Sequence, residues 1–363
     1  MRSLDEQIHE TPLLRRVANA QDLRQPTRLC CFGSERRSAL DWFRQQAQRA
    51  PDDLAVMDDR FRRWKVPAPA PELGHVVFGE RLRAKATRLA SHGSERLLYA
   101  TDPRLTPRRY APDYLEQNHA QFERLWQALE DDESRLVLGA ILRQRSSGDL
   151  GYLRVSQYPE YFHPIVKAEP GESVVDAGAF NGATSAAFAR SVGRRGRVYA
   201  FEPSRANRDL IRRRLLRPWN WGLRIQIVPE ALADTVGEAH FDEGRGGSGS
   251  LRDGGAPTPA RAEAVPVTTL DEFTKAGRRV DVISLDVEGA EPRVLAGAER
   301  LIETQRPKLQ ISVYHSHLHL FELPLRLLER YPDYALFLGH HDVYSTETDA
   351  YLMPRERLPK PAA

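Results

Sequence analysis

The sequence predicts an α/β protein in which a smaller domain precedes a larger one. From residue 173 onward, short apolar runs alternate with stretches of helical periodicity, which requires a parallel sheet with helices on both faces. An earlier β-α-β pattern begins near Arg28, and 363 residues are enough for two hydrophobic cores. We expect a small domain at 1–110, a helical connector at 111–150 and the main domain at 151–363.

The small domain begins with a strand at 28–33, a helix at 35–49 and a second strand at 54–57, followed by weaker strands at 76–78 and 97–99. This arrangement is Rossmann-like but degenerate. Its first turn, 33–38, contains one glycine, whereas a dinucleotide-binding loop needs three. The small domain is therefore predicted to have a structural or interaction role.

The connector is predicted from helical spacing between residues 111 and 145. Its apolar side chains recur at intervals that place them on one helix face; they are Leu115, Phe122, Leu125, Trp126 and Leu129.

The main domain has a regular succession of predicted elements. Strands are expected at 173–177, 197–201, 225–228, 280–285, 308–313 and 335–339, and helices at 184–192, 204–216, 291–304 and 318–330. Pro292 suits a first helical turn, and Pro307 ends that helix before the next strand. Residues 244–260, rich in Gly, Ser and Pro, are expected to form a long loop before an extended stretch at 265–271.

The overall charge does not favour a strongly charged partner such as nucleic acid or an anionic membrane. The net charge is +3, so no nucleic-acid or membrane partner is expected, and the arginines of 205–217, near Trp219 and Trp221, are interpreted as a solvated helix face. The N-terminus lacks the apolar run of a signal peptide, and no stretch approaches a membrane span. Cys30 and Cys31 are adjacent on a strand and point to opposite faces. A cytoplasmic protein is expected.

The most informative segment is 174–184 together with 199–203. It combines a buried strand ending at Asp176, a turn with Gly178 and Gly182, a helix, and a second strand ending at Glu202. Parallel sheets bind ligands at this carboxyl edge, and a carboxylate there can accept hydrogen bonds from both ribose hydroxyls. The G-x-x-x-G spacing differs from that of dinucleotide sites. The pattern predicts S-adenosylmethionine and methyl transfer; the alternative is a glycine turn needed only for packing.

Further polar residues follow later strands at the same edge. Glu230 and Ala231 are placed at the adenine side, although Glu230 could equally be a solvated loop acid. Asp286, Glu288 and Glu291 bring three carboxylates into six residues, which is costly unless a cation lies nearby. The donor's sulfonium, a substrate amine or a divalent metal could supply that charge, and Glu291 could instead interact with the dipole of the helix that starts there.

His315 follows the next strand. Methylating a hydroxyl requires removal of its proton, and histidine titrates near neutrality. His315 is therefore a candidate general base; the alternative is that it only makes a structural hydrogen bond. His317 and His319 alternate with it, but no cysteines or H-E-x-x-H spacing accompany them. A divalent metal is therefore left open and is not predicted.

Together these residues resemble the FkbM-type methyltransferases, a branch of the class I S-adenosylmethionine-dependent enzymes. The resemblance covers about residues 150–355, includes the preceding segment Gln157–Tyr161, and rests on these strings: Asp176-Ala-Gly-Ala-Phe-Asn-Gly182, Ala200-Phe-Glu-Pro203, Thr269-Leu-Asp271, Asp286-Val-Glu-Gly-Ala-Glu291 and Tyr314-His315. The triple-histidine run after Tyr314 departs from the more varied polar stretch typical of the family.

The resemblance implies a seven-stranded sheet whose last strand is antiparallel, and O-methylation of a sugar, glycan or secondary metabolite. It implies that Asp286, Glu288 and His315 face the acceptor, that Glu202 holds the ribose, and that Asp176, Gly178, Asn181 and Gly182 line the amino-acid end of the cofactor. The full set of predicted cofactor residues is Asp176, Gly178, Phe180, Asn181, Gly182, Thr184, Glu202, Pro203, Asn207, Glu230, Ala231 and Asp286.

Three alternatives stay open at this point. The chain could methylate nitrogen on a small molecule or peptide, or could be a non-catalytic scaffold that keeps the fold and binds a partner. A nicotinamide dehydrogenase is disfavoured by the loop spacing. The expected partner is a small-molecule or glycan acceptor, and the small domain could mediate a homodimer.

Overall fold

The computed structural model describes residues 4, 15–16, 27–32, 36–57, 74–78, 97–100, 110–149, 152–243, 249–252, 262–342 and 346–359. The chain divides into two compact units. Unit 1 comprises Met1–Trp126, Asp132–Ser156 and His340–Thr346, and unit 2 comprises Gln127–Asp131, Gln157–Gly339 and Glu347–Ala363. The turn glycine Gly33 and, apart from Leu4, the N-terminal segment considered for a signal peptide lie outside the described residues. None of the described helices is long and apolar enough to cross a bilayer.

Unit 1 contains a five-stranded sheet with the order β1-β5-β4-β2-β3 and the three helices of the predicted connector. Its elements are β1 (Arg15–Arg16), β2 (Thr27–Phe32), α2 (Arg36–Ala47), β3 (Asp53–Met57), β4 (Gly74–Phe78), β5 (Leu97–Ala100), α4 (Tyr114–Gln117), α5 (His119–Ala128) and α6 (Asp132–Ser147). The adjacent strands of this sheet are parallel, as a β-α-β start requires. On α5 the expected apolar face, Phe122, Leu125 and Trp126, is buried.

Unit 2 is built on a seven-stranded mixed sheet with the order β15-β16-β14-β13-β6-β7-β8. Its strands are β6 (Ser173–Ala177), β7 (Arg197–Phe201), β8 (Ile225–Val228), β13 (Val282–Leu285), β14 (Lys308–Ser312), β15 (Tyr334–His340) and β16 (Thr348–Pro354). β16 runs antiparallel to β14, which confirms the implied antiparallel last strand. β13 occupies the centre with β6 beside it, and the strand order reverses between these two strands, so the first predicted loop opens at that point.

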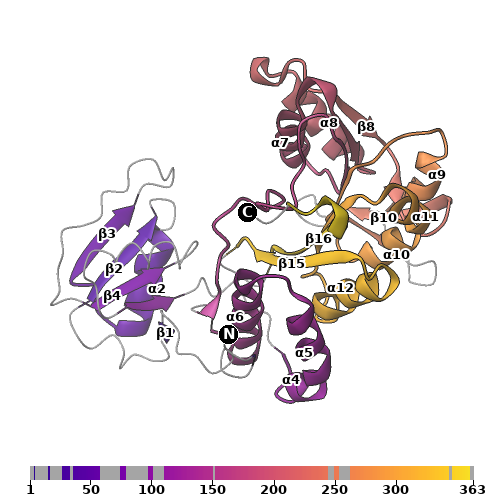
Figure 1. The fold of residues 1–363 in the computed structure, drawn as a ribbon. Coiled ribbons are helices and arrows are strands. Elements are labelled where there is room, and N and C mark those ends of the chain that lie inside the picture. The colour runs from indigo at the N-terminus through magenta and orange to yellow at the C-terminus, as the bar shows by residue number, and fades with distance from the viewer. Residues whose placement is uncertain are drawn as a thin grey trace. The chain divides into compact units, whose positions relative to one another are not determined.

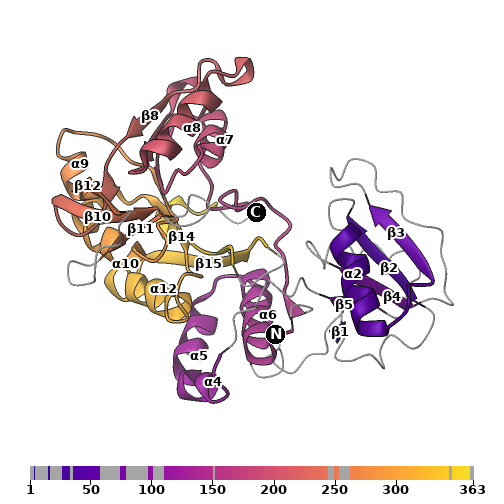
Figure 2. The ribbon, with the colours of Figure 1, turned by 180° about the vertical axis from the view of Figure 1, so that it is seen from behind.

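The helices of unit 2 connect these strands. They are α7 (Ala183–Val192), η3 (Gly193–Arg195), α8 (Arg205–Leu215), η4 (Pro218–Asn220), α9 (Leu270–Thr274), α10 (Glu291–Ala296), α11 (Glu299–Gln305), α12 (His319–Arg330) and η5 (Arg355–Arg357). In both ribbon views α7 and α8 lie near β8, whereas α12 lies near β15 (Figures 1 and 2). Phe188 of α7 packs in one core cluster with Val174 of β6, Val198 of β7 and Val282 of β13, and this core joins the three strands near their amino ends.

A second, four-stranded sheet was not predicted. Its order is β11-β10-β12-β9, with β9 (Ala231–Leu232), β10 (Gly237–Glu243), β11 (Gly249–Arg252) and β12 (Ala262–Thr268). The prediction of one long loop over 244–260 is therefore wrong, because β11 lies within it and pairs with β10. The extended stretch expected to reach Asp271 ends at Thr268; Thr269 accepts a hydrogen bond from Glu272 N at 2.9 Å and so caps α9.

The helix expected over 291–304 is also interrupted. It forms two helices, α10 and α11, separated at Gly297. A Cβ on Gly297 would lie 2.1 Å from the carbonyl oxygen of Ala233, so the close approach of that backbone requires glycine here. Asp271 accepts hydrogen bonds from the backbone N–H groups of Arg300 and Leu301 at 3.0 and 2.8 Å, and it thereby caps the second helix.

Candidate active site

A pocket opens at the carboxyl ends of β6, β7 and β13. The strands are aligned there, because Asp176 lies opposite Ser284 of β13 and Ala200 of β7. Its lining residues are Ala177, Gly178, Phe180, Phe201, Glu202, Pro203, Glu230, Ala231, Leu232, Phe241, Asp286, Val287, Glu288, Ala290, Tyr314 and Glu347. The pocket thus brings together most of the residues predicted from the sequence.

Gly178 allows the first loop to lie directly against the end of β13. Its φ is +87°, and a Cβ built there would lie 1.8 Å from the carbonyl oxygen of Asp286. No other residue type fits both the backbone conformation and this contact. The glycine therefore fixes the distance between the loop after β6 and the carboxylates after β13.

Glu202 is held by the backbone at the end of β7. Its Oε2 accepts a hydrogen bond from Phe180 N at 2.9 Å and its Oε1 accepts one from Ser204 N at 2.8 Å. The side chain is buried yet lines the pocket, and burial raises the pKa of this carboxyl to about 7, against the opposing effect of its hydrogen bonds. Each oxygen keeps further lone-pair capacity, which suits a neighbouring pair of hydroxyls.

The four-stranded sheet contributes apolar side chains to the same pocket. Ala231 and Leu232 of β9 and Phe241 of β10 line it, as does Glu230. Phe241, Ala231 and Val267 belong to one buried cluster of the four-stranded sheet. The second sheet therefore supplies apolar surface to the pocket, of the kind that an adenine ring packs against.

A second hollow adjoins the first and shares Gly178, Phe180 and Asp286 with it. It is lined by Glu160, Tyr161, Asp176, Gly178, Ala179, Phe180, Asn181, Ala183, Thr184 and Asp286. Ser185 donates a hydrogen bond to buried Asp176, and burial raises the pKa of that carboxyl to about 6. Asp176 and Asn181, both predicted to line the amino-acid end of the cofactor, therefore share this hollow with Thr184.

Two predicted cofactor residues have other positions. Among the described residues that line the two hollows, neither Gly182 nor Asn207 is present. Gly182 is the N-cap of α7 with φ of 73°. Asn207 is buried in the first turn of α8, and its side chain hydrogen-bonds to the Glu202 carboxylate. Asn181 is partly committed too, because its Oδ1 accepts hydrogen bonds from Ala183 N and Arg214.

Asp286 is the carboxylate most closely surrounded by polar side chains. Tyr161 donates a hydrogen bond from its hydroxyl to Asp286 Oδ2 at 3.1 Å, and the Tyr314 hydroxyl lies 3.3 Å from Oδ1. Burial raises the pKa of Asp286, and the neighbouring His315 limits the rise. The carboxylate still lines both hollows, so it can be reached by a bound molecule.

His315 lies within an arc of carboxylates. Its Nδ1 is 2.9 Å from Glu291 Oε1, and its Nε2 is 3.3 Å from Glu288 and 3.4 Å from Asp286. Burial alone would lower the pKa of this imidazole, but Glu288, Glu291 and Asp286 outweigh it and raise the pKa to about 10. The carboxylates thus favour the imidazolium form of His315 at neutral pH, whereas the sequence predicted a histidine that titrates near neutrality.

Glu291 connects the loop after β13 to His315. It is fully buried at the start of α10, and its Oε1 accepts hydrogen bonds from Val287 N and Gly289 N at 3.0 and 3.3 Å. Burial would raise the pKa of the carboxyl, but His315 and His319 lower it to about 2. Glu291 therefore stays ionised, orients His315 and accepts the hydrogen bonds of the loop's backbone N–H groups.

Further acids approach Asp286 from other segments. The side chains of Glu160, Asp286 and Glu347 have ligand atoms within 4.8 Å of one another, as do those of Asp286, Glu291 and His315. Burial, with Asp349 nearby, raises the pKa of Glu160 to about 7. Either trio is close enough to share a cation, and protonation of a carboxyl relieves the same repulsion.

Several site residues had no strong signal in the sequence. Tyr161 belongs to the segment Gln157–Tyr161 that precedes the first strand, and the resemblance of this segment to the family is the one clue to a role. Phe241 belongs to a strand that was not predicted. Glu160 and Glu347 reach the site from loops, and their approach to Asp286 depends on the tertiary fold alone.

Comparisons with known proteins agree with this geometry. The model of the methyltransferase FkbM domain family matches residues 176–342. A structure of the methyltransferase FkbM from Methylobacillus flagellatus KT covers 96% of this chain and 97% of its own, with 21% identity and a TM-score of 0.59. A search of curated proteins gave no match.

Two more distant structures match about half of the chain. A putative rRNA methylase from Clostridium thermocellum covers 51% of this chain and 86% of its own at 14% identity, with a TM-score of 0.31. Fibrillarin from Aeropyrum pernix, solved with natively bound S-adenosyl-L-methionine, covers 51% of this chain and 68% of its own at 13% identity, with a TM-score of 0.33. The match to the solved FkbM structure supports the fold, and the family model identifies residues 176–342 as a methyltransferase FkbM domain, that of an S-adenosylmethionine-dependent methyltransferase.

Proposed function

We propose that this enzyme transfers a methyl group from S-adenosylmethionine to a hydroxyl of a sugar, glycan or secondary metabolite. The observation that carries the proposal is Asp286, a carboxylate that lines both hollows beside an imidazolium and two tyrosine hydroxyls. A hydroxyl needs a proton acceptor during methylation, whereas a neutral amine does not. The proposal therefore rests on a base at the acceptor side of the pocket.

The residues present fit the donor. Glu202 supports the ribose, Ala231, Leu232 and Phe241 support the adenine, and the hollow beside Asp176 and Thr184 supports the amino-acid end. Gly178 leaves room for close approach at the boundary between the two hollows. When bound, the donor supplies an electrophilic methyl group on a sulfonium, and the surrounding carboxylates favour that positive charge.

We assign the proton acceptor to Asp286 rather than to His315. His315 holds its proton at neutral pH because its pKa is raised to about 10 by the adjoining carboxylates, so it cannot accept another. Burial raises the pKa of Asp286, which makes it a stronger base than an exposed aspartate. Tyr161 and Tyr314 orient its carboxylate, and His315 positions it and balances its charge.

Glu288 is proposed to bind the acceptor. Its side chain is 39% exposed and lines the pocket beside Asp286. Its φ is 53°, a left-handed backbone conformation that costs strain energy in any residue other than glycine. A carboxylate there can accept hydrogen bonds from a polyol. Holding the acceptor in line with the methyl group then contributes much of the rate.

A panel of acceptors tests the proposal. Release of S-adenosylhomocysteine is measured with the full-length protein and matched pairs of sugars that carry a hydroxyl or an amine at the same carbon. Turnover with hydroxyl sugars, abolished by Asp286→Asn, supports O-methylation. Turnover with the amino sugars alone, retained in Asp286→Asn, would instead establish an N-methyltransferase.

A further inference from the structure

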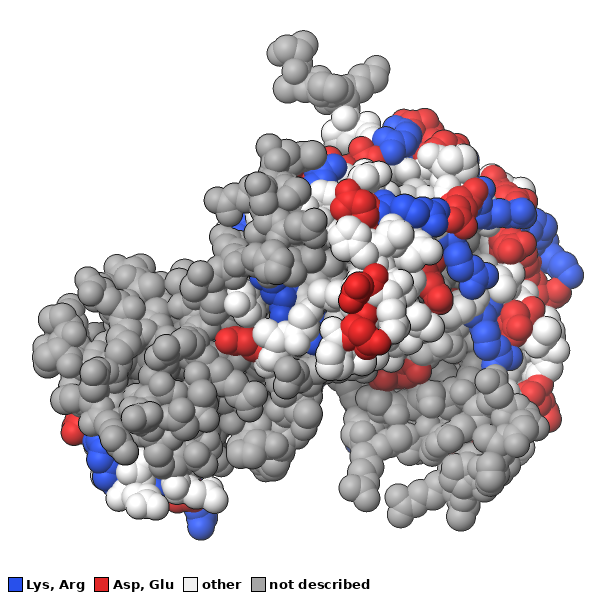
Figure 3. Space-filling model, turned by 90° about the horizontal axis from the view of Figure 1, so that it is seen from below, with Lys and Arg blue, Asp and Glu red and all other residues white. Residues whose placement is uncertain are grey.

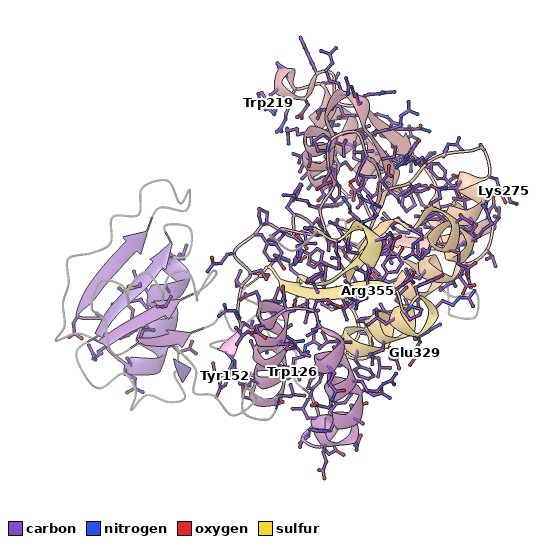
Figure 4. The ribbon with its side chains drawn as sticks, in the orientation of Figure 1. Trp126, Tyr152, Trp219, Lys275, Glu329 and Arg355 are labelled. Atoms are coloured by element: carbon purple, nitrogen blue, oxygen red, sulfur yellow. The ribbon has the colours of Figure 1, made fainter. Side chains whose placement is uncertain are left out.

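The connection between α8 and β8 exposes large apolar side chains to solvent. Among the described residues, the three most exposed large hydrophobics are Leu216, Trp219 and Trp221, with 74%, 69% and 73% of their surface accessible. Figure 4 shows Trp219 at the outer rim of unit 2, past α8. Two indoles and a leucine within six residues form one exposed group, unlike the scattered single hydrophobics of an ordinary surface.

This group has a defined conformation. Trp221 donates a hydrogen bond from Nε1 to Leu216 O at 3.1 Å, and the guanidinium of Arg217 lies 5.8 Å from the centre of the Trp219 ring. The turn is anchored below by buried Asn220, which donates to Arg214 O at 2.8 Å and accepts from Arg190 at 2.6 Å. The indoles are therefore held outward by a turn whose polar groups are already paired.

The surrounding charge is strongly positive. Residues 190–224 contain eleven arginines and two acidic residues, a formal charge of +9, although the whole chain carries only +3. Of the two acids, Glu202 is buried at the pocket and Asp209 pairs with Arg212 at 2.7 Å. The balanced net charge of the chain conceals this local concentration. On the face shown in Figure 3, by contrast, the described positive and negative residues are interspersed.

Several of these arginines are exposed and available. Arg190, Arg208 and Arg214 serve the fold, because they donate hydrogen bonds to Asn220, to the backbone beside Glu202 and to Asn181. No ion pair with an acidic side chain of the described residues involves four exposed arginines: Arg194, Arg195, Arg213 and Arg217. We call Leu216, Trp219 and Trp221, with these four arginines, the Trp–Arg surface.

The Trp–Arg surface lies at the edge of the sheet opposite the pocket. α8 ends and η4 follows before β8 begins, and Arg194 and Arg195 lie between α7 and β7. Both connections enter the amino ends of parallel strands, and Arg224 joins them by donating to Arg194 O at 3.4 Å. Contact through this surface therefore leaves the carboxyl edge, and with it the pocket, open.

We propose that the Trp–Arg surface docks on an anionic lipid surface. Indoles favour the boundary between headgroups and hydrocarbon, an exposed leucine gains by leaving water, and arginines are attracted to anionic headgroups. A second copy of the chain bound through the same surface would bring the arginines together. Single-stranded RNA would stack on the indoles, but Leu216 offers it no stacking face.

The test is cosedimentation of the full-length protein with vesicles of phosphatidylcholine, with and without phosphatidylglycerol. Binding is expected only with phosphatidylglycerol and is expected to weaken as salt is added. Trp219→Ser/Trp221→Ser should lower the partition coefficient about tenfold or more. Arg195→Gln/Arg213→Gln should lower it by about fivefold for each arginine removed.

Two matched variants control for the kind of change. Val236→Ser removes another exposed hydrophobic, which is 63% accessible, and Arg326→Gln removes an exposed arginine on α12. Both should bind the anionic vesicles like wild type, and urea unfolding of all variants confirms that each is folded. Tryptophan quenching by brominated lipid should occur in wild type and be reduced in Trp219→Phe/Trp221→Phe.

Three outcomes would overturn the proposal. Failure of wild type to bind anionic vesicles is the first, and equal binding by wild type and the double tryptophan variant is the second. The third is that the protein does not bind vesicles but binds a single-stranded RNA oligonucleotide, or dimerises in analytical ultracentrifugation, and that the double tryptophan variant loses this property.

Discussion

The part of the pocket around Glu202, which we call the donor half, is held in place by backbone hydrogen bonds. The part around Asp286, which we call the acceptor half, consists of charged side chains whose charges balance one another. Around Glu202, two backbone N–H groups and one glycine define the geometry. Around Asp286, the geometry depends on tyrosine hydroxyls and on His315, which faces three carboxylates. The donor half is therefore expected to keep its backbone geometry when one charge is removed, although its affinity for the donor falls. The acceptor half, in which charges balance one another, is expected to respond more strongly to pH.

The comparison also separates binding from chemistry. Interactions with the donor's ribose are the same before and after transfer, so they contribute affinity. A carboxylate that takes a proton during transfer contributes to rate instead. Substitutions in the two halves should thus be distinguishable by which constant they change, and the following experiments use that difference.

The largest expected effect belongs to Asp286. Asp286→Asn keeps the shape but removes the proton acceptor, so the single-turnover rate should fall by about 10²–10⁴-fold. Binding of S-adenosylhomocysteine should stay close to that of wild type. Glu288→Gln is the matched control on the same loop and should affect acceptor KM more than kcat. A smaller rate loss in Asp286→Asn than in His315→Gln would return the role of base to His315.

Gly178 tests the boundary between the two halves. In Gly178→Ala the new Cβ meets the Asp286 carbonyl, and the residue keeps a left-handed backbone, so we expect about 3 kcal/mol or more of lost unfolding free energy. Gly171→Ala is the control: φ there is +91° but nothing lies within 4 Å of the added carbon, and strain alone should cost about 1 kcal/mol. Urea denaturation measures both, and similar losses would remove the close contact as the cause.

His315 tests the charge balance of the acceptor half. Its pKa is raised from 6.5 to about 10, so its charged form stabilises the fold fully below pH 6.5 and this contribution disappears as pH rises through 10. The difference in unfolding free energy between wild type and His315→Gln should decline across this window. A difference that is constant from pH 6 to pH 10, by urea denaturation, would mean that the imidazole is neutral in the folded protein.

The sequence predicted the donor half well because its determinants are local. A buried strand ending at Asp176, the glycine turn and the acid at the tip of β7 are all visible in short windows. The order of six strands of the seven-stranded sheet followed from the same periodicity, whereas β16 was implied only by the family resemblance and the four-stranded sheet was not predicted. Once parallel strands are aligned, their carboxyl ends necessarily share one edge.

The acceptor half could be predicted only in part. Asp286, Glu288 and His315 were identified at the correct edge, but the protonation of His315 depends on Glu291, which approaches it only in the folded chain. Phe241 was missed because β10 is largely polar and has only a weak alternating pattern. The exposure of Trp219 and Trp221 likewise required the structure, since tryptophan in sequence more often indicates a core.

Calorimetric titration with S-adenosylhomocysteine tests the division between the halves most directly. Loss of charge-assisted hydrogen bonds to the ribose should weaken binding about 10–100-fold in Glu202→Gln, whereas Asp286→Asn should stay within about threefold of wild type. Equal affinity in wild type and Glu202→Gln would contradict the assignment of the ribose to Glu202, and with it the donor half as described.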